Sequence, residues 1–544
     1  MTHFMNKKED LVTEAIEGAI ASAGGTLTRL DGFPHIRVVL RSDWSRSKVA
    51  LISGGGSGHE PAHAGFVGKG MLTAAVCGDV FASPSVDAVL AAILAVTGPK
   101  GCLLIVKNYT GDRLNFGLAA ERARAFGHKV DMVVVDDDVA LPDVPQARGV
   151  AGTLFVHKIA GALAEQGANL ETITKSAKRI ISKSYSIGMS LDTCTVPGSP
   201  KENRIPSGKA ELGLGIHGEA GFEQVAYEGA SAAIAAVTDK LKTSMSDKPH
   251  VALVNNLGAG SVLEMSILTH ELLKSAIGTN IKWLVGPASM MTSLDMHGFS
   301  VSLLEASEED IKNLTAPVST IGWPGCVTLE EQDIIPLPDG LAPIKAMPSQ
   351  HEPTRAFLIS CCETFIASED DLNALDAKSG DGDTGSTLAN ASRALISAID
   401  TLPLSDATQL YRAIGQELSQ TMGGSSGVLL AIFFAAAGDA SSSGMPMRDS
   451  LKAGLDRMQQ IGGAKLGDRT MIDALAPALD ALSDGLEAAA TAARKGAAHT
   501  ATLTRAQAGR AAYLNAKQLV GHVDPGAEAV ARLFEFLAAR RSQS

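Results

Sequence analysis

Five prolines fall within residues 336–353, and this stretch constrains the fold more than any other feature of the sequence. Proline fixes φ and donates no backbone hydrogen bond, so a run of this density predicts a linker rather than a helix or a strand. Short apolar runs alternate with helical patterns before it, whereas only helical periodicity follows Pro353. The sequence therefore predicts an α/β region at residues 1–335, a linker at 336–353 and an all-helical region at 354–544.

The α/β region is expected to form two lobes. Its strands are almost continuously apolar and alternate with helical stretches, which is typical of a mostly parallel sheet. Beyond residue 250 a second series of strands and helices alternates in the same way, which indicates a second lobe. The expected strands are residues 36–40, 49–52, 102–106, 130–135, 251–254, 282–285 and 300–304, and the expected helices are 11–20, 85–96, 113–126 and 261–273.

Composition narrows the function and the cellular location. The formal net charge of −12 argues against a general nucleic-acid binder. Six cysteines without regular spacing do not form a disulfide framework, which fits a reducing cytoplasm. Residues 1–10 are too polar for a signal peptide. The longest apolar runs, residues 88–96 and 428–437, are too short to span a bilayer, so we expect buried helices there.

Polar residues follow two of the expected strands, where open α/β sheets bind ligands. The strand at 49–52 runs into a glycine-rich turn that contains His59 but matches neither a Walker loop nor a dinucleotide fingerprint. The strand at 102–106 is followed by Lys107 and Asp112, which suit a small polyhydroxylated ligand, and Asp112 is placed to accept a hydroxyl proton. The alternative is a surface lysine and an N-cap aspartate.

Two further polar segments of the α/β region are candidates for a functional role. His217 lies in a glycine-rich segment that leaves its imidazole approachable, and an unprotonated imidazole is both a nucleophile and a base. The alternative is a structural histidine. The carboxylates at residues 136–138 follow a strand and lack a spacing that supports a metal, so we expect a solvated loop with a helix-capping role.

The helical region contains a turn at residues 375–387 that brings together Asp376, Asp381 and Asp383. These carboxylates would repel one another, and a hard divalent cation with oxygen ligands would relieve that repulsion. The turn lacks the ligand pattern of an EF-hand. Ser386 and Thr387 stand at a helix start, where anions are favoured, so the turn suggests magnesium and a nucleotide phosphate chain. The alternative is a solvated loop between helices.

Several other loops of glycine and polar residues open helices in this region. In a helical bundle, loops at one end lie together, so these segments predict the mouth of a nucleotide site. Each of them also fits a plain connection between helices. The segments are residues 421–427, 462–463, 467–473, 509–510 and 524–527.

The motifs GGGSGHEP, KNYTGD, GLGIHGE, LDAKSGDGDTG, TMGGSSG, GDRTM and DPGA occur in this order. Together they resemble the single-chain, ATP-dependent dihydroxyacetone kinases over nearly the whole chain. The resemblance implies an antiparallel barrel of helices as the nucleotide domain, a substrate domain before the linker and a homodimer. It also implies phosphorylation of a small ketose by ATP. A four-carbon ketose such as erythrulose, glyceraldehyde, an FMN cyclase-type lyase activity and a nonenzymatic regulator stay open as alternatives.

The resemblance also implies roles for individual residues. His217 would form a hemiaminal with the substrate carbonyl, His59 would assist as acid and base, and Asp112 would deprotonate the attacking hydroxyl. Two magnesium ions would be held by Asp376, Asp381 and Asp383. The substrate would be held by Gly56, Ser57, Gly58, His59, Lys107 and Asp112. ATP would be surrounded by Thr384, Gly385, Ser386, Thr387, Ser425, Ser426, Gly462, Thr470, Met471, Arg510, Asp524, Pro525 and Gly526.

Overall fold

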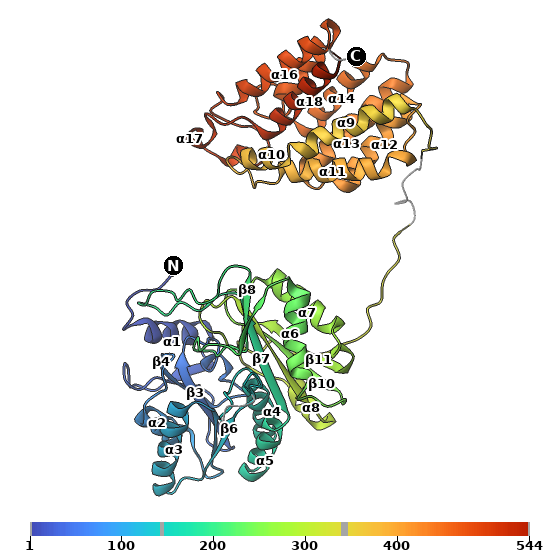
Figure 1. Ribbon diagram of the computed structural model, residues 1–544. Helices are drawn as coiled ribbons and strands as arrows, with labels where there is room; N and C mark the ends of the chain where they lie inside the picture. The colour runs from blue at the N-terminus through green and yellow to red at the C-terminus, as the bar shows by residue number, and fades with distance from the viewer. Residues whose placement is uncertain (1–2, 142–145, 339–345, 542–544) are drawn as a thin grey trace. The chain divides into compact units, whose positions relative to one another are not determined.

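The computed structural model describes residues 3–141, 146–338 and 346–541. The chain divides into two compact units, Met1–Asp333 and Ile334–Ser544 (Figure 1). The first unit is α/β and the second is helical, which confirms the predicted fold class. In the described residues no strand follows β13 (Cys326–Thr328). Residues 339–345 of the predicted linker lie outside the described part of the chain.

The first lobe is built on a six-stranded sheet with the order β1-β2-β4-β3-β5-β6. Strands β4, β3, β5 and β6 run parallel, and β1 and β2 add an antiparallel edge. Sequence analysis missed β4, which is rich in small residues. The strands are β1 (Leu27–Arg29), β2 (Val38–Arg41), β3 (Ala50–Ser57), β4 (Ala74–Val80), β5 (Cys102–Lys107) and β6 (Val130–Val135).

Helices cover both faces of this sheet, so its strands are buried on both sides. Helices α2 and α3 share one apolar core with the sheet, and α1, α4 and α5 share another (Figure 1). Neighbours on β3 alternate between the two cores, as Leu51 and Ile52 show. The helices are α1 (Leu11–Ser22), α2 (Val86–Val96), α3 (Thr110–Ala125), α4 (Thr153–Glu165) and α5 (Leu170–Ile181).

The second lobe has a seven-stranded sheet with the order β13-β11-β10-β12-β7-β8-β9. Only β10 and β11 pair in parallel, so the expectation of a mostly parallel sheet is wrong for this lobe. The connection 289–297 before β12 is too short for the helical crossover that parallel strands need. The elements are β7 (Ser184–Ser190), β8 (Lys209–Leu212), β9 (Glu223–Ala226), α6 (Ala230–Lys242), β10 (His250–Asn256), α7 (Val262–Lys274), β11 (Ile281–Ala288), β12 (Gly298–Glu305) and α8 (Glu308–Thr315).

The helices of the second unit pack side by side in a closed ring. Contacts run from α9 through α11, α12, α13, α14, α15, α16 and α18 back to α9 (Figure 1). This ring agrees with the expected helical barrel. The helices are α9 (Glu352–Ala367), α10 (Glu369–Asp376), α11 (Thr384–Ala398), α12 (Ala407–Thr421), α13 (Gly424–Ser442), α14 (Met447–Gly462), α15 (Ile472–Ala481), α16 (Leu486–Thr500), α17 (Ala516–Leu519) and α18 (Pro525–Arg541).

The two long apolar runs, residues 88–96 and 428–437, differ in how far they are buried. Residues 88–96 lie in α2, and most of them are buried, as expected. Residues 428–437 lie in α13, a 19-residue helix. Only 22% of the apolar stretch of this helix is buried, so the expectation of a buried helix is wrong there. Among the described residues α13 alone has the length and composition to cross a membrane. One such helix is weak evidence for a span, since core helices of soluble proteins pass the same test.

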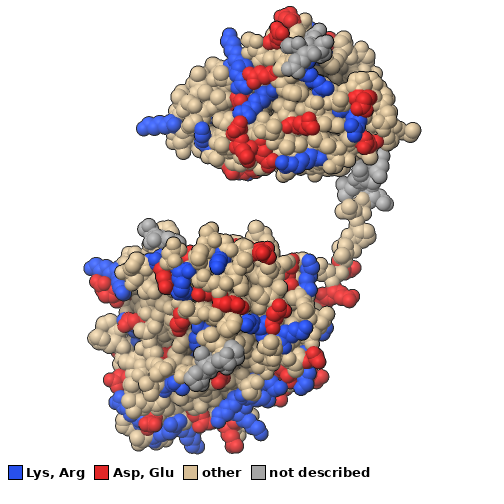
Figure 2. All heavy atoms as spheres, in the orientation of Figure 1, with Lys and Arg blue, Asp and Glu red and all other residues tan. Residues whose placement is uncertain are grey.

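Charged side chains are mixed on the visible surface. Figure 2 shows acidic and basic groups interspersed on the displayed face of each unit.

Candidate active site

The first part of the expected glycine-rich turn is strand, because β3 continues through the glycines to Ser57 and pairs there with β4, and this part is packed too tightly for side chains. A Cβ atom on Gly54 would lie 2.2 Å from the carbonyl oxygen of Val76, and one on Gly56 would lie 2.7 Å from the backbone nitrogen of Ala82. Both neighbours are backbone atoms, which cannot move aside as a flexible side chain can. The glycines therefore let the backbone of β3 approach β4 and the segment that follows β4.

Lys107 and Asp112 face the same turn from the end of β5 and the start of α3. Lys107 is 0% exposed and Asp112 is 3% exposed. A Cβ atom on Gly55 would lie 3.5 Å from Nζ of Lys107 and 3.6 Å from Oδ2 of Asp112, so both side chains point at the turn. Within the described residues, Nζ of Lys107 and Oδ1 of Asp112 have no hydrogen-bond partner. Buried polar groups left unpaired in this way mark a place for a polar ligand.

These positions exclude the alternatives that the sequence left open for Lys107 and Asp112. The lysine is not on the surface. Asp112 is the third residue of α3, and the N-cap position belongs to Tyr109, which makes no side-chain capping bond. Burial lowers the pKa of Lys107, while the charges of Asp112 and Glu219 act in the opposite direction. Burial raises the pKa of Asp112, and the charge of Lys107 opposes that rise.

The rings of His59 and His217 lie together between two aromatic side chains. Their centroids are 4.9 Å apart, in an edge-to-face arrangement. Phe81 stacks on His59 at 5.1 Å, and Tyr109 contacts His217 at 4.5 Å. Phe81 holds this place with φ of 56°, an uncommon value for a residue other than glycine. The aromatic rings limit the space around both imidazoles.

The surroundings of His59 fix its protonation. Burial and the nearby charge of Lys107 hold its pKa well below the usual value, so the ring is neutral. Its Nδ1 lies 2.8 Å from the carbonyl oxygen of Thr292, which can only accept a hydrogen bond. Nδ1 therefore carries the proton and Nε2 carries a lone pair. Nε2 is buried and has no partner among the described residues.

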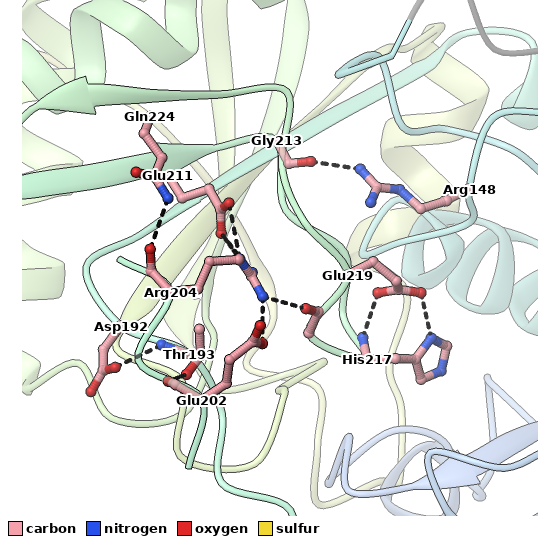
Figure 3. A network of polar contacts seen from close by, with 11 residues as sticks. Arg148, Asp192, Thr193, Glu202, Arg204, Glu211, Gly213, His217, Glu219 and Gln224 are labelled. Atoms are coloured by element: carbon pink, nitrogen blue, oxygen red, sulfur yellow. Dashed lines mark hydrogen bonds and ion pairs between the residues drawn. The ribbon is translucent and has the colours of Figure 1, made fainter. Parts of the chain in front are cut away.

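The loop after β8 presents His217 together with Glu219. Nδ1 of His217 lies 3.0 Å from Oε1 of Glu219, and the backbone N–H of His217 donates to Oε2 at 2.9 Å (Figure 3). Arg148 fixes the same loop by donating to the carbonyl oxygen of Gly213 at 2.6 Å. Sequence analysis missed Glu219, Arg148, Phe81 and Thr292. Only Glu219 had a signal, because it stands two residues after His217.

The carboxylates after β6 were expected to be solvated, but only one of the three is exposed. Asp136 is exposed, but Asp137 and Asp138 are buried. Asp137 accepts N–H bonds from Val150 and Gly152 at 2.8 Å, in the segment just before α4, and α4 itself has no side-chain cap, so the expected capping role is wrong. Burial raises its pKa to about 6. Asp138 pairs with Arg148 at 2.7 Å, so these residues brace the loop of His217.

In the helical unit, the predicted aspartate turn is formed between α10 and α11. Oδ2 of Asp376 accepts the N–H groups of Gly382, Asp383 and Thr384 at 3.0–3.2 Å, and these bonds shape the turn. One oxygen from each of Asp376, Asp381 and Asp383 can be chosen so that all three lie within 4.8 Å of one another. Asp376 is buried, and the other two are exposed.

Charge at this turn is only partly balanced. Burial and the charges of Asp381 and Asp376 raise the pKa of Asp383. Arg510 forms an ion pair with Asp381 from the segment after α16. The donor set consists of carboxylate oxygens alone and is partly open to solvent, which fits a magnesium ion.

The other predicted nucleotide-site residues lie at helix ends of the ring. Where successive helices run in opposite directions, alternate helix ends lie at the same end of a bundle. A Cβ atom on Gly526 would lie 3.2 Å from Cβ of Met471, which brings the starts of α15 and α18 together. Thr384–Thr387 begin α11, Ser425 and Ser426 lie in the first turn of α13, Gly462 ends α14, Thr470 and Met471 precede α15, and Asp524–Gly526 begin α18.

Asp524 caps α18 by accepting the N–H of Ala527 at 2.9 Å. Burial raises its pKa to about 6, against the nearby charge of Arg469. Arg469 is 1% exposed, and within the described residues its Nε and Nη1 make no hydrogen bond. This buried cation beside the predicted nucleotide site was missed, because an arginine in a loop is normally solvated.

Comparison with known proteins gives the same order of domains. A Dak1 domain matches residues 17–322 and a DAK2 domain matches residues 378–539. The chain is 48% identical to the dihydroxyacetone kinase of Citrobacter freundii, with 98% of each chain covered. It is 40% identical to the triokinase/FMN cyclase of Mus musculus, with 97% of each covered.

A solved structure extends this likeness to three dimensions. The crystal structure of the C. freundii dihydroxyacetone kinase in complex with AMP-PNP and Mg²⁺ matches with a TM-score of 0.69 and 46% identity over 99% of both chains. Both domain families and the full-length relatives thus agree with the motifs. The chain belongs to the dihydroxyacetone kinase family, in which a Dak1 domain and a DAK2 domain are joined in one chain.

Proposed function

We propose that the protein transfers the γ-phosphate of ATP to a hydroxyl group of dihydroxyacetone. The observation that carries this proposal is the cluster of buried His59, Lys107 and Asp112 near the ends of β3 and β5, against which the half-buried His217 lies. Its unpaired polar atoms suit a small ketose with two hydroxyl groups. The likeness to a kinase crystallised with AMP-PNP and Mg²⁺ supports ATP as the phosphate donor.

In the proposed reaction His217 holds the ketose covalently. Its Nε2 lone pair forms a bond to the carbonyl carbon, and the π electrons of the carbonyl group move to oxygen. That oxygen takes up one proton from bulk solvent, which His59 relays through Nε2, because its Nδ1 proton is already bonded to Thr292. The product of this step is a hemiaminal whose imidazole ring carries a positive charge.

Phosphoryl transfer then requires an activated hydroxyl and a neutralised phosphate chain. Asp112 accepts the hydroxyl proton, and its raised pKa makes it a better base than a solvated aspartate. Lys107 is placed to hydrogen-bond the substrate oxygen beside Asp112. Magnesium bound by Asp376, Asp381 and Asp383 would neutralise phosphate charge. The helix starts of α11, α13 and α18 would bind phosphate oxygens through backbone N–H groups.

The covalent step can be tested by its chemistry. A crystal soaked in dihydroxyacetone should show continuous density between an imidazole nitrogen of His217 and the carbonyl carbon. Glycerol has the hydroxyl groups but no carbonyl, so it should be a very poor substrate. His217→Ala should lose substrate affinity and rate, whereas His270→Ala on the exposed face of α7 should not. Glycerol turnover close to that of dihydroxyacetone would refute the hemiaminal.

Related activities need separate assays. Erythrulose and glyceraldehyde also carry a carbonyl beside a hydroxyl, so turnover of these compounds should be compared with that of dihydroxyacetone. The mouse relative bears the name triokinase/FMN cyclase, which favours a second assay for lyase activity on FAD. We further propose two magnesium ions, a homodimer and a cytoplasmic location, the last supported by six cysteines that are all free.

A further inference from the structure

We propose that Glu219 is a positioning residue for His217. It holds the proton on Nδ1, leaves Nε2 free to attack the substrate carbonyl, and stabilises the positive charge that the ring gains when the carbon–nitrogen bond forms. This inference rests on the proposed hemiaminal. It adds a residue whose function is not to touch the substrate but to set the protonation and the orientation of the group that does.

The geometry shows a carboxylate that binds one residue twice. Oε1 of Glu219 contacts the ring nitrogen Nδ1 at 3.0 Å, and Oε2 accepts the backbone N–H of the same histidine at 2.9 Å (Figure 3). Two bonds from one planar group fix both the backbone and the side chain of His217. The ring can then turn about neither of its side-chain torsions without losing the bond to Nδ1.

The charge of Glu219 decides which nitrogen is protonated. Burial disfavours its charged form, but the bonds from the side chain and backbone of His217 outweigh burial and lower the pKa of Glu219 to about 2. An ionised carboxylate only accepts hydrogen bonds, so Nδ1 must be the donor. In the neutral ring Nε2 then carries the lone pair. Among the described residues nothing hydrogen-bonds to Nε2 of His217.

The covalent step places a positive charge on the ring of His217, which is why a charged partner such as Glu219 matters. Nε2 supplies the electron pair of the new bond to carbon, and the carbonyl oxygen takes up one proton from bulk solvent, so the complex gains one proton and one positive charge. The proton on Nδ1 stays in place, so the ring becomes an N-substituted imidazolium. Glu219 faces this new positive charge at hydrogen-bond distance, and an ionic partner stabilises it more than a neutral one would.

A glycine makes room for this contact. A Cβ atom on Gly215 would lie 2.0 Å from Oε2 of Glu219 and 2.9 Å from Nη1 of Arg148. Arg148 in turn is held by Asp138 and by the carbonyl oxygen of Gly213. Gly215 therefore permits the close approach of Glu219 to His217, and Arg148, from the segment between β6 and α4, supports the loop (Figure 3).

The test compares three variants. Glu219→Gln keeps an oxygen for Nδ1 but removes the charge, and Gly215→Ala keeps the charge but displaces the carboxylate. Glu202→Gln is the matched control, because Glu202 pairs with Arg204 in the adjacent network, is 62% exposed and does not touch His217. Two readouts are needed: the ¹⁵N spectrum of labelled His217, which reports its tautomer, and the fraction of ¹³C-carbonyl dihydroxyacetone bound as the adduct.

We expect Glu219→Gln and Gly215→Ala to reduce the adduct and to raise KM about ten- to a hundredfold, with a smaller effect on kcat. Gly215→Ala should also mix the two tautomers, and the Glu202→Gln control should match the wild type. Wild-type adduct and KM in both test variants would overturn the inference. If the wild type forms no adduct at all, the proposed hemiaminal fails instead. The tautomer of His217 then still shows whether Glu219 sets it.

Discussion

Replacing Gly56 by alanine should damage the candidate substrate site without removing any polar group. The added Cβ would lie 2.7 Å from the backbone nitrogen of Ala82 and 2.8 Å from both Cα and the carbonyl carbon of Phe81. Ordinary van der Waals contact begins near 3.4 Å. Because the neighbours are backbone atoms, the segment that carries Phe81 must move away.

The size of that movement follows from these distances. The separation must grow from 2.7 Å to 3.4 Å, a shift of about 0.7 Å in a tightly packed strand end. Phe81 stacks on His59 and contacts His217, so both rings lose their packing. Overpacking of this kind costs about 1–3 kcal/mol of stability. A misplacement of about 1 Å costs about a hundredfold in rate, so we expect a loss of at least about tenfold in kcat/KM.

The assay measures dihydroxyacetone kinetics and the thermal midpoint of the substrate unit for Gly56→Ala beside Gly117→Ala. Gly117 lies in α3 of the same lobe, and a Cβ atom there would meet nothing within 4 Å. Alanine favours a helix over glycine by about 1 kcal/mol, so the control should be at least as stable as the wild type and fully active. A Gly56→Ala protein with kcat/KM within twofold of the wild type would refute the steric reasoning.

Two predictions concern the aspartate turn. Asp381→Asn keeps the size of the side chain but removes a charge. It should therefore abolish most phosphoryl transfer and leave the ketose adduct in the other unit intact. Kinase activity near the wild-type level would mean that the metal binds elsewhere. Arg510→Gln removes the cation that pairs with Asp381. Arg510 and a metal ion would compete for Asp381, and an exposed ion pair is worth about 0–1 kcal/mol. In the variant, calorimetry should therefore find that Mn²⁺ binds up to about fivefold more tightly without nucleotide and that ATP binds more weakly. Unchanged affinities for both would contradict this competition.

Where the apolar pattern was strong, the sequence was sufficient to place the elements of the fold. The strand expected at 130–135 is β6 itself, and the helix expected at 85–96 differs from α2 by one residue. The missed strands β4 and β7 contain glycine, alanine and serine, whose intrinsic preference for strands is weak. Their neighbours in the sheet hold them in place, and pairing of that kind is not visible in the sequence of one strand.

The site could be predicted only in part, for a similar reason. Lys107 and Asp112 follow a strand end, so their position near a ligand was predictable. Their burial was not predictable, because local sequence does not reveal which distant residues, such as Glu219 near Lys107, lie around them. Thr292 lies 233 residues from His59, yet its carbonyl oxygen sets the tautomer of that ring. Arg469 is likewise buried, and it donates to the carbonyl oxygen of His522, 53 residues further along the chain.

The hydrogen-bond partners of the two histidines favour His217 over His59 as the site of the proposed covalent bond. Both rings have an acceptor at Nδ1, so both present the lone pair of Nε2. The acceptor of His59 is a neutral carbonyl group, and burial near Lys107 further lowers its pKa, so a permanent positive charge on that ring is costly. The acceptor of His217 is a carboxylate, which stabilises such a charge. We therefore expect the covalent bond at His217 and only transient proton transfer at His59.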